Sequence, residues 1–378
     1  MIEEIHIAGF RSLREVTLPL KKLNVIYGKN GSGKSSVAYA CQVVKNIMTN
    51  PNRSLDSFFN LGFINLGKFE DITFRHDQLS ETELWFKVRD FAFPLSYLIQ
   101  FDHTRDCVFQ IWNDKFKTEI ASEFPYEIKE KTFTVNNVGY EFNGFSVDSI
   151  EKAGFLLTVQ INSALKIIQN IECIPVKRGF FNPIYPIEES NPENRIADII
   201  AKDEKGILVE KVNSGIKKIF EKEFRVHNIR GTQQFRMRTV KGEFITEIVN
   251  EGFGLNQTIA ILIQLLKPET TLALIEEPEI HLHPTAQSAL MEVFIEAIEK
   301  DNKQILLSTH SENIVSTILA KISEGTLSKD DVQFFLCTSE KGETKIEPQQ
   351  INEHGQIEGG LMPFMESELE NLKKMLKI

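Results

Sequence analysis

Residues Gly28–Ser35 combine glycines with one lysine and one serine in a spacing that suits phosphate chemistry. The segment reads Gly-Lys-Asn-Gly-Ser-Gly-Lys-Ser, which fits G-x-x-x-x-G-K-[ST], and it lies between an apolar run and a helical one. Glycines let main-chain N–H groups point at an anion, and the start of a helix adds a positive dipole end. We expect Lys34 to reach the β- and γ-phosphates of a nucleotide and Ser35 to ligate Mg²⁺.

This segment, called the phosphate loop below, predicts binding of ATP with Mg²⁺. A glycine-rich turn without function is the alternative, and the motif's place between a strand and a helix argues against it. The candidate nucleotide ligands are Gly28, Asn30, Gly31, Ser32, Gly33, Lys34, Ser35 and Ser36.

Two adjacent carboxylates, Glu276 and Glu277, end the apolar run that begins at Thr271. Glu276 is placed to hold Mg²⁺, directly or through water, and Glu277 to accept a proton from an attacking water. The alternative is a plain strand followed by an acidic turn. The phosphate loop in the same chain favours the catalytic interpretation.

His310 follows the next apolar run, Gln304–Leu307, one β-α unit beyond the carboxylates. A histidine at such a strand end can contact the γ-phosphate and sense its loss. A lone histidine after a strand is more often structural, but its place in this series favours the functional role.

The elements that must position these residues follow from hydrophobic periodicity. Buried strands are predicted at Leu23–Tyr27, Leu272–Ile275 and Gln304–Leu307, and helices at Lys34–Met48, Phe155–Asn170, Asn194–Phe220, Thr258–Leu266, Thr285–Lys300 and Glu366–Lys377. Residues 56–147 show short strands and turns, which predict an antiparallel sheet. Alternating helices and apolar strands predict a parallel sheet covered on both faces.

Composition restricts the partners. The net charge is −10 over 378 residues, so nucleic-acid contact must be confined to a local patch. The most basic stretch carries Arg225, Arg230, Arg236 and Arg238, which suits either a nucleic-acid backbone or a solvated strand face. Lys177–Phe181 is a second, weaker candidate.

The remaining composition predicts a cytoplasmic protein that is not in a membrane. The four cysteines are far apart and form no C-x-x-C pair, which argues against a disulfide framework or a zinc site. The N-terminus lacks the pattern of a signal peptide, and the longest apolar run is too short to span a bilayer.

Several motifs together resemble the ABC-type ATPases of the SMC, RecF and OLD group, in particular the stand-alone prokaryotic "AAA family ATPase" branch. The resemblance covers about residues 1–75 and 250–340. It rests on Phe10-Arg11-Ser12, the phosphate loop, Glu276-Glu277-Pro278-Glu279, His281-Leu282-His283-Pro284 and Ser308-Thr309-His310, with Asn65–Asp71 and Ile351–Leu376 pointing to that branch.

The resemblance implies an α/β fold, a P-loop NTPase head of ABC type. It would combine a mixed parallel core sheet with an antiparallel β subdomain and a helical lobe. The implied divisions are 1–75 (N-terminal part of the ATPase lobe), 76–150 (antiparallel β subdomain), 151–250 (helical and strand insertion), 251–340 (C-terminal part of the ATPase lobe) and 341–378 (C-terminal cap).

The resemblance also implies further site residues. Gly252, Gly254 and Asn256 stand where a signature motif would bind the γ-phosphate held by a second subunit, with Gly252 in place of the usual serine. Glu279–Pro284 would be the D-loop at a homodimer interface, although His281 and His283 could instead pair on a metal. The glutamine that links lobe and metal is open between Gln78 and Gln100.

Three functions follow as expectations. The first is an ATP-driven ATPase for DNA processing or anti-phage defence that works with a separate effector such as a nuclease. No Asp-x-Asp follows His310, so a TOPRIM nuclease in this chain is not expected. The second is a nucleotide-gated scaffold for a partner protein without DNA contact. The third, a transporter subunit, fits the Phe10-Arg11-Ser12 pattern least.

Overall fold

The computed structural model describes residues 1–77, 79–90, 93–127, 131–187, 195–352 and 354–358. The chain divides into two compact units, which we describe separately. Unit 1 consists of Met1–Cys173 and Gln333–Gln349, and unit 2 of Ile174–Val332 with the chain from Gln350 onward. Gln78 and the predicted helix Glu366–Lys377 lie outside the described residues.

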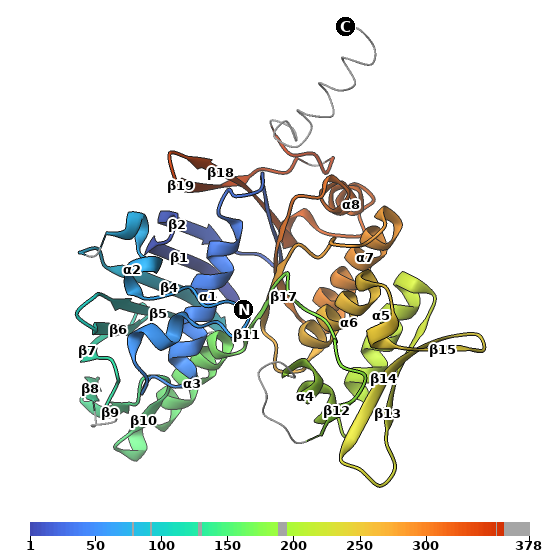
Figure 1. Ribbon diagram of the computed structural model, residues 1–378. Helices are drawn as coiled ribbons and strands as arrows, with labels where there is room; N and C mark the ends of the chain where they lie inside the picture. Colours follow the sequence, from blue (N-terminus) through green and yellow to red (C-terminus); the bar gives the residue numbers. More distant parts are fainter. Residues whose placement is uncertain (78, 91–92, 128–130, 188–194, 353, 359–378) are drawn as a thin grey trace, which may run out of the picture. The chain divides into compact units, whose positions relative to one another are not determined.

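Unit 1 is built on a six-stranded antiparallel sheet of order β2-β1-β4-β5-β6-β7. Its strands are β1 (Ile2–Phe10), β2 (Leu13–Pro19), β4 (Thr82–Asp90), β5 (Phe93–Phe101), β6 (Asp106–Trp112) and β7 (Lys117–Glu123). Alternate side chains of β4 are buried, as a half-covered strand requires. Helices α1 (Lys34–Thr49) and α3 (Phe155–Gln169) pack against the sheet (Figure 1).

A smaller antiparallel sheet of order β10-β9-β8 follows in unit 1. It contains β8 (Lys131–Val135), β9 (Val138–Phe142) and β10 (Val147–Ser149). The side-chain amide of Asn162 on α3 bonds both the N–H and the C=O of Val147, at 2.8 Å each, and so ties the helix to this sheet. The predicted antiparallel strands are confirmed from Thr82 onward, as is the helix near Phe155. The first part of the predicted range, residues 56–76, is wrong as strand, because it forms the short helices η1 (Leu55–Phe59), α2 (Phe69–Ile72) and η2 (Phe74–His76).

Three further strands of unit 1 lie next to the phosphate loop. β3 (Leu23–Tyr27) is fully buried and lies beside β18 (Val332–Glu340), which pairs with β19 (Glu343–Gln349) in an antiparallel hairpin. Short elements complete the chain up to β11: η1 (Leu55–Phe59), α2 (Phe69–Ile72), η2 (Phe74–His76), η3 (Lys152–Gly154) and β11 (Ile171–Ile174).

Unit 2 contains a β-α-β crossover. β16 (Leu272–Glu276) and β17 (Gln304–Thr309) are parallel neighbours joined by α7 (Pro284–Lys300), so the predicted parallel pairing is confirmed. Helix α5 packs on α6 and α7, and α7 packs on α8 (Figure 1). The helix bounds are α4 (Arg195–Ala201), α5 (Ile207–Phe220), α6 (Phe253–Leu266) and α8 (Glu312–Ser323).

The single helix predicted over Asn194–Phe220 is wrong, because the chain breaks between α4 and α5. Gly206 adopts φ 69°, a left-handed conformation that ends the continuous helical path. The carboxylate of Asp203 accepts a hydrogen bond from Val209 N at 2.8 Å and so caps the new helix.

Unit 2 also carries an antiparallel sheet of order β12-β14-β13, with β15 paired to β14. The strands are β12 (Tyr185–Pro186), β13 (Glu223–Asn228), β14 (Gln234–Lys241) and β15 (Phe244–Glu247), and the short helices η5 (Ile248–Asn250) and η6 (Lys329–Asp331) complete the unit. In the described part of the chain, no helix is long and apolar enough to cross a membrane.

Candidate active site

The phosphate loop joins the buried strand β3 to helix α1, as its motif predicts. Gly31 and Gly33 have φ values of 74° and 101°, which residues with a Cβ rarely adopt. The ammonium of Lys34 lies within the loop and donates to the main-chain oxygens of Gly28 and Lys29, at 2.9 Å each. Lys34 is therefore positioned at the loop by main-chain acceptors.

Within unit 1, the hairpin β18–β19 contacts the phosphate loop and supports it. Thr344 Oγ1 donates to Ser32 O at 2.8 Å and lies 2.8 Å from Ser12 Oγ. A Cβ on Gly28 would collide with the main-chain oxygen of Cys337, and one on Gly33 with the Thr344 hydroxyl. Sequence reasoning missed this support, because no local signal joins the loop to residues some 310 positions later.

The loop fits a phosphate group. The hydroxyl of Ser32 is buried and has no hydrogen-bond partner among the described residues, so it is available to an acceptor oxygen. Helix α1 begins at Lys34 and directs its first N–H groups toward the loop. Asn30 and Gly31 are exposed at the tip, Ser35 is half-buried, and Ser36 is buried.

The two carboxylates stand where β16 ends in unit 2. Glu276 is the buried last residue of the strand, and Glu277 turns the chain with φ 43°. A left-handed residue that is not glycine costs about 1–2 kcal/mol, so this turn needs support from its surroundings. Glu277 N donates to Ser308 O at 2.9 Å, which extends the β16–β17 pairing by one residue.

Glu279 links this turn to His310. Its buried carboxylate accepts hydrogen bonds from Thr309 Oγ1 at 2.7 Å and from His310 N at 3.0 Å. His310 Nδ1 in turn lies 3.6 Å from Glu277 Oε1 and 3.8 Å from Glu279 Oε1. The structure thus brings Glu277 and His310 together at the ends of two parallel strands, and it adds Glu279, whose supporting role the sequence did not suggest.

Arg178 is a second residue that sequence reasoning missed. Its guanidinium is buried and donates to the main-chain oxygens of Glu276 at 2.6 Å and Glu277 at 2.9 Å. Burial lowers the pKa of Arg178 to about 10, which still leaves it charged at neutral pH. The interpretation of Lys177–Phe181 as a nucleic-acid patch is wrong for Arg178, because its side chain faces the interior.

The predicted signature segment opens helix α6. Gly252 is the exposed N-cap, and a Cβ on Gly254 would collide with the main-chain oxygen of His281. Asn256 is buried: its Oδ1 accepts from Phe180 N at 2.7 Å, and its Nδ2 donates to Phe180 O at 2.8 Å. Its amide is therefore bonded within unit 2.

The predicted D-loop leads into helix α7. His283 is the N-cap of α7, and its Nδ1 accepts from Thr285 N at 3.4 Å, while the His281 ring lies 5.6 Å from that of Phe253. No group of three or more metal-ligating side chains occurs in the described ranges, and the two histidines have separate surroundings. Gln100 bonds the carboxylate of Glu81.

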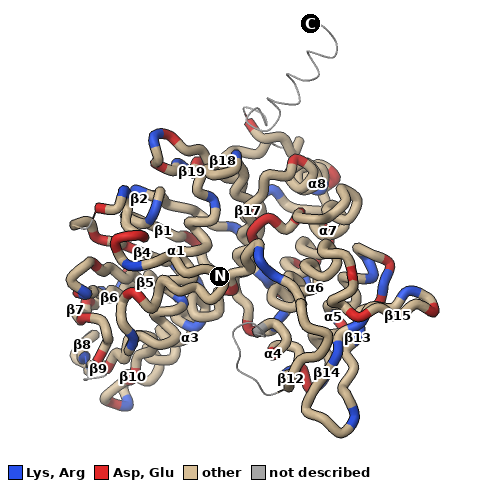
Figure 2. The backbone as a smooth tube through the Cα atoms, viewed as in Figure 1, with Lys and Arg blue, Asp and Glu red and all other residues tan. Residues whose placement is uncertain are grey.

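Glutamates from outside the basic stretch balance much of its charge. Glu247 on β15 lies 2.7 Å from Arg238 and 3.5 Å from Arg236, and Glu223 lies 2.6 Å from Arg225. Arg230 is exposed between β13 and β14. Figure 2 shows acidic segments among the basic ones of this sheet.

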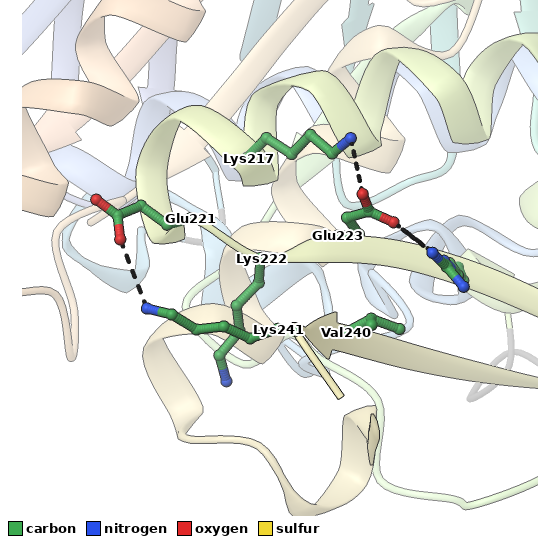
Figure 3. Close-up of a pocket in the computed structure, with 8 residues that line it drawn as sticks. Lys217, Glu221, Lys222, Glu223, Val240 and Lys241 are labelled. Carbon is green, nitrogen blue, oxygen red and sulfur yellow. Dashed lines mark hydrogen bonds and ion pairs between the residues drawn. The ribbon is translucent and has the colours of Figure 1, made fainter. Parts of the chain in front are cut away.

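A pocket of about 440 Å³ at one end of this sheet has the same mixed character. Lys217 lies 3.0 Å from Glu223 and Lys241 lies 3.5 Å from Glu221. Figure 3 shows both ion pairs. The eight lining residues are Lys217, Glu221, Lys222, Glu223, Arg225, Val240, Lys241 and Gly242. Its four cations are paired with glutamates, two of which, Glu221 and Glu223, line the pocket themselves.

The predicted site residues are divided between the units. Lys34 and Ser35 belong to unit 1, whereas Glu276, Glu277 and His310 belong to unit 2. The model of one protein family, described as "AAA domain, putative AbiEii toxin, Type IV TA system", matches residues 23–316, which include all five. The chain belongs to this family.

Two solved structures show the same fold as this family member. One is the SMC head bound to the C-terminal winged-helix domain of ScpA, with a TM-score of 0.57 and 13% identity over 92% of this chain and 97% of that one. The other is the SMC head with an extended coiled coil bound to the C-terminal domain of ScpA from Pyrococcus furiosus, with a TM-score of 0.53 and 12% identity over 99% of each chain. No curated protein matches the sequence.

The family and these structures confirm the predicted class. The chain is an AAA domain with a P-loop NTPase fold like that of the SMC heads, in which parallel strands are combined with antiparallel sheets. At this level of identity the SMC heads establish the fold alone.

Proposed function

We propose that this chain binds ATP with Mg²⁺ and hydrolyses ATP to ADP and phosphate. In this proposal the phosphate loop and Lys34 hold the β- and γ-phosphates. Ser35 and Glu276 hold Mg²⁺, which when bound neutralises phosphate charge as the transferred group departs. Glu277 accepts a proton from the attacking water, and His310 contacts the γ-phosphate.

The pairing of Glu277 with His310 in an ATPase family carries the proposal. The Glu277 side chain is 28% exposed and that of His310 is 41% exposed, so both groups can reach solvent while their main chain is held. A general base must be close to water yet fixed in direction. The turn that holds Glu277 meets both requirements.

The first test compares ATP binding and hydrolysis in three variants. We expect Lys34→Ala to abolish ATP binding, since its ammonium is the buried cation that the loop holds with its own main-chain oxygens. Glu277→Gln should keep ATP binding and lose turnover, because an amide cannot accept the water's proton. Glu299→Gln, an exposed carboxylate-to-amide change on α7, is the matched control and should behave as wild type. Normal turnover by Glu277→Gln would show that the base is another group.

We further propose that ATP closes a homodimer through the segment around Gly252 and Gly254 and through Glu279–Pro284. The fold supports this proposal, and so does the exposed helix start at Gly252. Glu277→Gln should then accumulate as an ATP-bound dimer in sedimentation analysis, while Lys34→Ala stays monomeric. A Glu277→Gln protein that binds ATP and remains a monomer would contradict the gating step.

The coupled process is proposed to be DNA processing or anti-phage defence with a separate effector. The structural relatives are described in complex with a protein, ScpA, which makes a protein effector a reasonable partner class. DNA would contact Arg225, Arg230, Arg236 and Arg238 on β13, β14 and the turn between them. Turnover that rises on addition of duplex DNA, and falls again in Arg230→Ala, would support this function.

A nucleotide-gated scaffold without DNA contact is the second proposal. The glutamates that pair with Arg225, Arg236 and Arg238 favour it, since a paired cation contributes less to phosphate binding. Turnover that is indifferent to DNA, together with ATP-dependent capture of a protein partner, would select this alternative.

A further inference from the structure

The segment Pro175–Phe180, called the strap below, contacts the turn that carries the proposed base. Arg178 Nη1 donates to Glu276 O at 2.6 Å and to Pro175 O at 2.8 Å, and Nη2 donates to Glu277 O at 2.9 Å. All three acceptors are main-chain oxygens. The guanidinium therefore fixes the directions of these peptide groups.

Packing alone does not account for an arginine at this place. Arg178 is 3% exposed, and burying a charged group is costly unless geometry and hydrogen bonding compensate. An unbranched apolar side chain would fill a similar volume without that cost. The planar fork of donors supplies what such a side chain lacks, which is simultaneous hydrogen bonding to successive carbonyls.

The hydrogen bonds from the strap hold a main chain whose conformation at Glu277 is strained. Glu277 has φ 43°, and its N–H is bonded to Ser308 O at 2.9 Å while its C=O is bonded to Arg178. With the N–H and the C=O of this residue both bonded, its main-chain torsions are held. The direction of its Cα–Cβ bond, and hence the approach of its carboxylate to His310, is then set.

The other end of the strap is anchored on helix α6. Asn256 bonds both the N–H and the C=O of Phe180, at 2.7 and 2.8 Å, and Phe180 is buried. Hydrogen bonds thus tie the strap to the first turn of α6 at Phe180 and to the turn of Glu277 at Arg178, and only Gly179 separates these two residues in the main chain.

We propose that the strap is a positioning device, in which Arg178, anchored through Asn256, holds the main chain of Glu277 so that its carboxylate meets the attacking water. Arg178 is a positioning residue, since it acts through Glu277. The inference rests on the proposed role of Glu277 as base and adds a connection between that base and the start of α6.

The test uses the full chain with Arg178→Met, Arg178→Lys and a control, Lys202→Met, which removes an exposed cation of unit 2 outside the strap. Steady-state ATP hydrolysis gives kcat and KM, and hydrogen–deuterium exchange gives the protection of residues 276–282. For Arg178→Met we expect kcat to fall by about 10- to 100-fold, as misplacement of a catalytic group does, with KM for ATP changed less than about threefold. Exchange should rise in 276–282. Arg178→Lys should recover part of the kcat, and Lys202→Met should match wild type.

Two results for Arg178→Met would overturn the inference. The first is wild-type kcat and exchange. The second is a raised KM with an unchanged kcat, because the defect would then be in nucleotide binding. If Arg178→Met fails to fold, Arg178→Lys decides, and wild-type kcat and exchange in a folded Lys variant refute the need for the fork.

The exchange measurement separates this inference from the proposed function. If the wild-type protein does not hydrolyse ATP, the proposed function fails, and the strap is still tested without turnover. Faster exchange confined to 276–282 in Arg178→Met then supports the strap as a holder of this turn. Unchanged exchange overturns it.

Discussion

Replacing Asn256 with alanine tests whether this residue is an internal anchor or a ligand of the nucleotide. Its side chain is 4% exposed and makes three hydrogen bonds. The partners are Phe180 N at 2.7 Å, Phe180 O at 2.8 Å and Ile248 O at 3.2 Å. Alanine leaves one main-chain N–H and two main-chain oxygens in the interior without these partners.

The expected loss of unfolding free energy follows from those groups. A buried polar group left unpaired costs about 1–3 kcal/mol, and the two bonds to Phe180 are the short ones, so they contribute roughly 3 kcal/mol. The longer bond to Ile248 adds about 0.5–1 kcal/mol. Alanine's better helix propensity returns about 0.5 kcal/mol. We expect Asn256→Ala to lower the unfolding free energy by about 3 kcal/mol.

Gln257→Ala is the control on the same helix. Gln257 Oε1 has no hydrogen-bond partner among the described residues, so its removal unpairs no main-chain group through that atom. We expect a change of less than about 1 kcal/mol. Comparison of the two variants isolates the hydrogen bonds of Asn256 from the general effect of alanine on α6.

The assay must report on unit 2. Both tryptophans, Trp85 and Trp112, lie in unit 1, so intrinsic fluorescence is the wrong probe. Urea unfolding followed by circular dichroism, with hydrogen–deuterium exchange of the peptide around Phe180, gives global and local readouts. An Asn256→Ala protein with wild-type stability and exchange but reduced ATP hydrolysis would refute the anchor role. This outcome would instead favour the prediction that Asn256 contacts a γ-phosphate.

Two further substitutions test the support of the phosphate loop and a buried cation. Gly28→Ala should displace the loop from the Cys337 carbonyl. We expect ATP binding to be lost in calorimetry and the unfolding free energy to fall by about 1–3 kcal/mol. Burial lowers the pKa of Lys303 from 10.5 to about 8. Between these pH values the unfolded chain binds a proton that the folded chain has released, so the unfolding free energy should rise with pH. Urea titrations from pH 8 to 10 should show a steeper rise for wild type than for Lys303→Met, and equal slopes would contradict the shift.

The sequence predicted the elements whose signals are local. An apolar run followed by glycines and a helical period defines β3, the phosphate loop and α1 over some 25 residues, and the structure agrees to within one residue at Thr49. The crossover from β16 to β17 was predictable for the same reason. The break before α5 was not, because Asp203 and Gly206 act through a cap and a left-handed turn that a hydrophobic period does not register.

The support of the site could not be predicted, because it depends on contacts between distant segments. Arg178 bonds residues 98 and 99 positions later, and Thr344 bonds one 312 positions earlier. In the sequence Arg178 stood in a basic run and suggested a surface role. The basic stretch, by contrast, looked free of acidic partners in the sequence, because Glu247 lies outside it. In the structure Glu247 lies beside Arg238.

Two sets of hydrogen bonds hold the turn after β16, and they constrain different parts of the site around Glu277. The strap bonds the main-chain oxygens of Glu276 and Glu277, whereas Glu279 bonds the end of β17 through Thr309 and His310 N. Loss of the first set frees the peptide direction of the proposed base. Loss of the second frees the strand that carries its histidine partner. Because neither set involves the carboxylate of Glu277 itself, that group stays available to water while its backbone is fixed, which is the property a general base requires.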